Sequence, residues 1–203
     1  MTIRSILIPF ALALGLMSAG CAQFLKVPVN YNAPKQFEVP AAATKVDLKV
    51  GLYIPPAVRA YKIEEEERGV VSKYKFGEAL SDGIERMFRN TFEDVVILDS
   101  PQYDAAVTGI EAVVVPEVAS ADFRSAAPSD KGGVSFLIRV KYEAKDAAGR
   151  SLWVDTFEGQ GNMKAKITGS VNGEVMKRGL EDHFRKASSG LLESEWWKPL
   201  GRE

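Results

Sequence analysis

Cysteine and histidine are almost absent from this chain. Cys21 is the only cysteine and His183 the only histidine, so no intramolecular disulfide can form. The nitrogen and sulfur ligands of a tetrahedral zinc site are also lacking. A Ser-His-Asp triad that includes His183 would need a serine and an acidic residue from distant parts of the sequence, and no motif indicates them. We therefore expect no enzyme activity, no metal and no cofactor, and we interpret His183 as a partly exposed helix residue.

The chain also lacks an excess of either charge. It has 26 Lys and Arg residues against 27 Asp and Glu, a formal net charge of -1, whereas nucleic-acid-binding surfaces carry a basic excess. We expect no nucleic-acid partner. The run Glu64-Glu65-Glu66-Glu67 lacks the spaced ligands and the glycine of a calcium loop, so we interpret it as solvated. Gly159-Gln160-Gly161 lacks the third glycine of a dinucleotide fingerprint, and we reject that interpretation.

No apolar run is long enough to cross a bilayer comfortably. The longest covers residues 6–17, while a spanning helix needs about 20 apolar residues. A basic residue precedes this run, and small residues follow it, which is the layout of a secretory signal peptide. We predict that residues 1–20 form a cleaved signal.

The stretch Ser18-Ala19-Gly20-Cys21 resembles a bacterial lipobox, in which a signal peptidase cuts before a diacylated cysteine. Ser18 stands where the family usually has leucine. The resemblance implies that Cys21 carries acyl chains, and two or three chains give a stable membrane anchor. Ala22 stands where an inner-membrane retention signal would have aspartate, so we expect the outer membrane, with the domain facing the periplasm. The alternative is an ordinary signal peptide that leaves a cysteine near the new N-terminus.

The mature chain divides into a tether and one domain. Residues 21–44 contain three prolines and no sustained period, so we predict a lipidated tether, although Phe24, Tyr31 and Phe37 leave open that part of it packs on the domain. Residues 45–203 have the length of a single domain.

Apolar periodicity predicts an α+β domain. Alternation indicates a strand at 46–54, and steps of three and four residues indicate helices over 76–92 and from an N-cap at Asn172 to near Pro199. We expect further strands at 95–98, 104–118, 134–145 and 151–160, a hairpin turn at 146–150 and a loop at 120–133. We leave 57–66 unassigned. The order predicts a two-layer α/β sandwich, with a mixed or antiparallel sheet of about five strands and two helices on one face.

The tryptophans are the side chains best suited to contact a partner. Indoles join a large apolar area to a polar N–H and are favoured at interfaces. Trp196 and Trp197 either cap the core at the end of the last helix or contact a partner, and both alternatives stay open. Trp153 lies on the same face of the predicted strand as Phe157, because side chains alternate with a period of two, and it is predicted to lie in the core.

The order of elements resembles that of YajG-like and ABC-transport auxiliary periplasmic lipoproteins. The resemblance rests on the lipobox, the tether, the strand at 46–54, the helix at 76–92 followed by 95–98, and the strand start at 103–107. The resemblance implies a non-enzymatic accessory component of an envelope complex, acting through protein–protein contacts at a sheet edge or the Trp196-Trp197 end. The alternative function is a periplasmic carrier of a lipid or other apolar ligand, which would need an apolar pocket. A hydrolase dependent on His183 is a third hypothesis.

Overall fold

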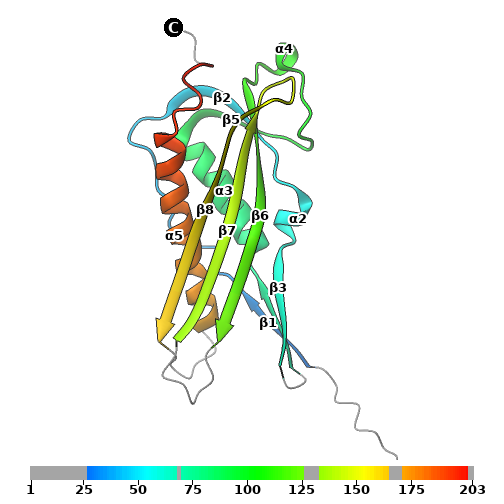
Figure 1. Cartoon of the computed structure of the whole chain (residues 1–203), viewed down its shortest axis with the longest axis vertical. Helices are drawn as coiled ribbons and strands as arrows, with labels where there is room; N and C mark the ends of the chain where they lie inside the picture. Colours follow the sequence, from blue (N-terminus) through cyan, green and yellow to red (C-terminus); the bar gives the residue numbers. More distant parts are fainter. Residues whose placement is uncertain (1–26, 68–69, 126–132, 165–170, 201–203) are drawn as a thin grey trace, which may run out of the picture.

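The computed structural model describes residues 27–67, 70–125, 133–164 and 171–200. Its strands form a five-stranded sheet of order β5-β2-β6-β7-β8 and a three-stranded sheet of order β1-β4-β3 (Figure 1). The strands are β1 Val27–Asn32, β2 Val46–Leu52, β3 Lys62–Glu67, β4 Val70–Lys75, β5 Phe92–Ile97, β6 Ala112–Ser125, β7 Gly133–Lys145 and β8 Ser151–Lys164. The helices are α2 Pro56–Arg59, α3 Gly77–Thr91, α4 Ala105–Thr108 and α5 Val171–Glu193. The predicted signal and Cys21 lie outside the described residues.

The five-stranded sheet is mixed, because its two halves are connected differently. Strand β2 pairs in parallel with β5 and β6, and α3 provides the crossover that a parallel pair requires. Strands β6, β7 and β8 are antiparallel neighbours. In the β7–β8 turn, Gly149 has a φ of 77°, and the Asp146 carboxylate accepts the amides of Ala148 and Arg150, each at 2.9 Å. The predicted hairpin is confirmed.

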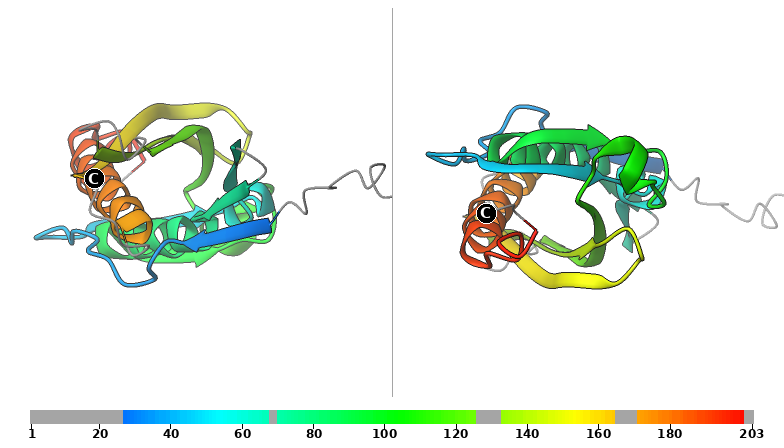
Figure 2. Two further views of the ribbon diagram at one scale, coloured as in Figure 1. Left: turned by 90° about the horizontal axis from the view of Figure 1, so that it is seen from below. Right: turned by 90° about the horizontal axis from the view of Figure 1, so that it is seen from above.

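Helices α3 and α5 cover one face of this sheet, and the other face is open to solvent (Figure 2). Side chains of β7 alternate between the core and the open face, as a half-buried strand requires. Phe136 and Tyr142 are buried on the helix side. Arg139 is on the open face, where it pairs with Glu158 at 2.7 Å. The predicted fold class, including two helices on one face, is therefore confirmed.

Glycines allow α5 to lie directly against β8. A Cβ at Gly161 would stand 2.0 Å from the carbonyl oxygen of Val175, and a Cβ at Gly159 would stand 2.2 Å from that of Gly179. Because glycine carries only a hydrogen atom in place of a Cβ, the backbone of α5 can lie against the strand at these two positions. This close contact is what Gly159-Gln160-Gly161 provides.

The predicted tether needs correction from residue 27 onward. Strand β1 pairs in parallel with β4, and the ring of Phe37 is buried against Phe184, with ring centres 5.6 Å apart. Proline-rich composition suggested an extended linker, but the apolar rings of this segment found partners on the domain. The alternative, that part of this segment packs on the domain, is correct for Tyr31 and Phe37, while Phe24 lies outside the described residues.

Both ends of β6 and both ends of α5 also differ from the prediction. Residues 105–108 form α4, capped by the Asp104 carboxylate, which accepts the Ala106 amide at 2.9 Å, so the strand begins at Ala112 rather than at 104. Strand β6 continues to Ser125, into the segment expected to be a loop, because long pairing with β7 compensates for its small polar residues. Asn172 lies inside α5 rather than at its N-cap, and α5 ends at Glu193, before Pro199.

Candidate functional site

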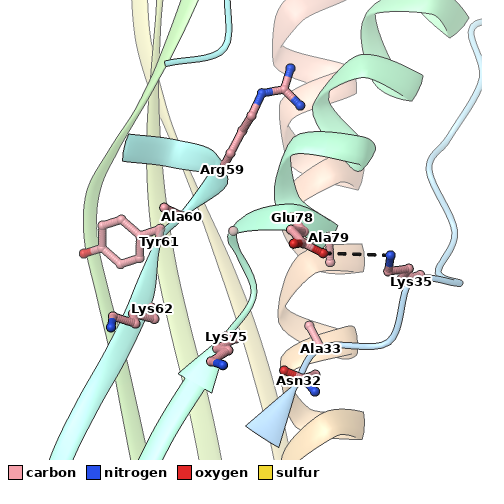
Figure 3. Close-up of a pocket in the computed structure, with 11 residues that line it drawn as sticks. Asn32, Ala33, Lys35, Arg59, Ala60, Tyr61, Lys62, Lys75, Glu78 and Ala79 are labelled. Atoms are coloured by element: carbon pink, nitrogen blue, oxygen red, sulfur yellow. Dashed lines mark ion pairs between the residues drawn. The ribbon is translucent and has the colours of Figure 1, made fainter. Parts of the chain in front are cut away.

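A groove lies where the small sheet, α2 and α3 meet (Figure 3). It has a volume of about 610 Å³, within the range of small-molecule sites. We call it the basic groove, and its lining residues come from the segment after β1, from α2 and β3, from the end of β4 and from the first turn of α3. They are Asn32, Ala33, Lys35, Arg59, Ala60, Tyr61, Lys62, Lys75, Gly77, Glu78 and Ala79.

Four of these residues are cationic and one is acidic, so the basic groove is positive in a chain whose net charge is -1. Lys35 lies 3.8 Å from Glu78, and both side chains are largely exposed, so this pair is weak. Lys62 contacts Glu64 at 2.6 Å, and this hydrogen bond lowers the pKa of the exposed Glu64 carboxyl from its usual value. The glutamate run therefore lies on β3, partly paired with lysines.

Close backbone packing holds Arg59 beside the beginning of α3. The amide of Gly77 donates to the carbonyl of Tyr61 at 3.1 Å. A Cβ at Gly77 would stand 2.5 Å from the carbonyl oxygens of Val58 and Arg59, so only glycine fits without a shift. Phe76, the residue at the N-cap of α3, offers no side-chain hydrogen bond to the first turn.

No sequence pattern predicted the basic groove. Its cations are spread from Lys35 to Lys75, each in a polar context that predicts ordinary solvent exposure. They meet only because β1 joins β4 in a sheet that was not predicted.

The two C-terminal tryptophans have different environments. Trp196 is only 7% exposed and stacks on Trp153, with ring centres 6.2 Å apart. Trp197 is half-buried and meets the edge of Phe92, with ring centres 5.9 Å apart. Trp196 therefore caps the core, while Trp197 keeps an accessible surface, and the partner contact predicted for the pair stays a prediction. Trp153 and Phe157 pack against the core, as predicted.

The outer edge of β8 is partly occupied by side chains. Asp182 of α5 accepts the amide of Gln160 at 3.0 Å, and Asp155 accepts the amide of Thr156 at 2.7 Å. Burial alone would raise the pKa of Asp182, but hydrogen bonds from Lys186, Gln160 and Arg185 outweigh it and lower that pKa. Occupied amides disfavour the addition of a partner strand at this edge.

His183 is fully buried, which corrects the expectation of a partly exposed residue. Its Nε2 atom lies 2.8 Å from the hydroxyl of Tyr142 on β7. Burial lowers the pKa of His183 to about 4 and raises that of Tyr142 above its usual value. The ring faces the sheet because α5 lies so close to β8. At neutral pH the pair is thus an uncharged hydrogen bond within the core.

No protein-family model and no curated protein matches the sequence. The fold, however, is similar to a crystal structure of a Xanthomonas campestris protein of the DUF330 family, with 11% identity, a TM-score of 0.59 and coverage of 85% of this chain and 99% of that chain. It is also similar to a Helicobacter pylori protein described as a homologue of the neuraminyllactose-binding hemagglutinin, with 8% identity, a TM-score of 0.51 and coverage of 84% and 98%. A minor lipoprotein from Acinetobacter baumannii gives 11% identity, a TM-score of 0.46 and coverage of 75% and 96%.

These similarities define a class of fold. The described chain shares its fold with the Xanthomonas campestris protein of the DUF330 family and with the Helicobacter pylori protein. Among the described helices, none combines the length and apolar character needed to span a membrane.

Proposed function

We propose that this chain is a non-enzymatic accessory component of an envelope complex, anchored in the outer membrane by acyl chains on Cys21 and facing the periplasm. The signal-like start before Cys21 supports the anchor. The basic groove also supports a binding role, because four of the described residues that line it are cationic and attract anions.

The half-buried indole of Trp197 is the observation that carries the protein-docking part of this proposal. Strand β1 begins near one end of the molecule, and the segment after α5 lies at the other (Figure 1). Helix α5 alone has 23 residues and spans about 34 Å. The Trp197 end is therefore remote from the start of β1, which follows Cys21 by six residues in the sequence. Accessible tryptophan is enriched among the residues that dominate binding energy at interfaces.

The alternative, a carrier of an apolar molecule, receives less support. The basic groove exceeds the roughly 300 Å³ that such a ligand requires, but four cations line it. Charged rims of this kind favour an anionic group over a purely apolar one, since an apolar ligand would strip water from the cations without replacing it.

Replacing Trp197 by alanine should remove the docking partner while the domain stays folded. We expect crosslinked purification of the full-length lipoprotein from native membranes to yield one protein near equal stoichiometry, and at least tenfold less of it with Trp197→Ala. The matched control is Tyr31→Ala, because Tyr31 is also half-buried and stacked, on Tyr74. A Cys21→Ala variant should leave the membrane fraction.

Equal recovery of the partner with Trp197→Ala and with the wild type would overturn docking at this end. Loss of the partner in both aromatic variants would indicate general destabilisation, which thermal unfolding of each purified variant reports separately. Retention of Cys21→Ala in the membrane by the same fractionation would contradict the lipid anchor.

A further inference from the structure

Two cations of the basic groove have no anionic partner among the described residues. Ion pairs are present for Lys35 and Lys62, whereas Arg59 and Lys75 have none in the described part of the chain, and both are exposed. They come from different elements, α2 and β4, and both line the same cavity as the first turn of α3. Two uncompensated charges on separate elements create a positive potential focused on the groove between them.

The first turn of α3 adds to this potential. Amides in the first turn of a helix have no acceptor within it. Here the N-cap residue supplies no side-chain hydrogen bond, and Glu78 and Ala79 of that turn line the groove. The Gly77 amide is already used by Tyr61. Two acidic groups oppose this field: Glu78 in the lining, paired with Lys35, and Asp82, which borders the adjoining cavity with Arg59. The cations still outnumber the acids.

We propose that the basic groove binds a phosphate monoester or diester of headgroup size. Arg59 supplies a planar fork of donors that matches phosphate oxygens, and Lys75 supplies a point charge. The cavity of about 610 Å³ is much larger than a single phosphate ion needs, so the rest of the ligand occupies the space beside Asn32 and Tyr61. This site is separate from the Trp197 end and does not depend on docking there.

The cation arrangement favours a compact ligand over an acidic peptide. The charges come from separate elements instead of following one strand or one helix face: Figure 3 shows Lys35 pointing toward Glu78, Arg59 extending beside α3 and Lys75 at the end of β4. An extended peptide would need charges spaced along its length. The phosphate has two sources, a membrane phospholipid headgroup and a free phosphate ester.

The test is calorimetric titration of the full-length lipoprotein in neutral detergent with glycerol 1-phosphate, with short-chain phosphatidylglycerol and with a hexaglutamate peptide. Arg59→Gln combined with Lys75→Gln should weaken phosphate binding at least tenfold. The matched control is Arg124→Gln with Lys164→Gln, because these residues are an exposed arginine and an exposed lysine outside the groove. The control should change affinity less than twofold.

Tighter binding of phosphatidylglycerol than of glycerol 1-phosphate would support a lipid headgroup as the source, and equal binding would support a free ester. The proposal is overturned if neither phosphate ligand binds, if the groove and control variants weaken binding equally, or if hexaglutamate binds more tightly than both. The unfolding midpoints of the two double variants verify that each is folded. We expect both to be folded, because all four substituted side chains are exposed.

Discussion

Gly161→Ala should cost at least about 3 kcal/mol of the free energy of unfolding, the upper end of what overpacking does in a well-packed protein. The new methyl group would stand 2.0 Å from the carbonyl oxygen of Val175 and 2.7 Å from the amide nitrogen of Gly179. Both contacts are backbone atoms inside α5, so no rotamer change can relieve them. The helix has to move away from β8, and urea unfolding of the purified protein measures the loss.

The control for this substitution is Gly173→Ala, in the same helix. There the nearest atom to an added Cβ is the carbonyl oxygen of Asn32, at an ordinary 3.4 Å. Alanine is favoured over glycine in helix interiors by up to about 1 kcal/mol, so this variant should be as stable as the wild type or more so. A small effect of Gly161→Ala, matching that of Gly173→Ala, would show that α5 and β8 are less closely packed than the structure has them.

Acidification from pH 7 to pH 5 should destabilise the protein by roughly 2 kcal/mol through His183 alone. Burial lowers the pKa of this residue to about 4 in the folded state, from 6.5 in the unfolded chain. The unfolded state therefore binds the proton first. The stability contributed by neutral His183 is complete above pH 6.5 and is lost as the pH falls through the folded-state value, reaching about 3 kcal/mol in total.

A His183→Gln variant isolates this contribution, because glutamine does not titrate and its amide can still hydrogen-bond to Tyr142. We expect the variant to be less stable at pH 7 but to lose about 2 kcal/mol less than the wild type between pH 7 and pH 5, measured by urea midpoints. His183 is the only histidine, so no other imidazole titrates between these pH values. The carboxylates are the same in both proteins and change the stability of both alike. If the wild type and the His183→Gln variant lose the same stability between pH 7 and pH 5, the ring of His183 is already solvated in the folded state.

Local pattern decided which segments form the large sheet and its two helices. The alternation that begins at Val46, the three- and four-residue steps from Phe76 to Phe92 and the glycine turn at Gly149 each depend on neighbours in sequence, so the sequence alone predicts them. The predicted signal and the acylation predicted at Cys21 rest on the same kind of local pattern, because they depend only on adjacent residues. These features gave the α+β class and the expectation of a lipoprotein.

Tertiary packing decided the features that depend on residues far apart. Pairing of β1 with β4 turned part of an expected tether into a sheet and brought Lys35, Arg59 and Lys75 to one groove. Contact between α5 and β8 gave Gly161 its role and buried His183 against Tyr142. Periodicity reports which face of an element is apolar, but not which element will cover it, because that depends on the shape of the whole core.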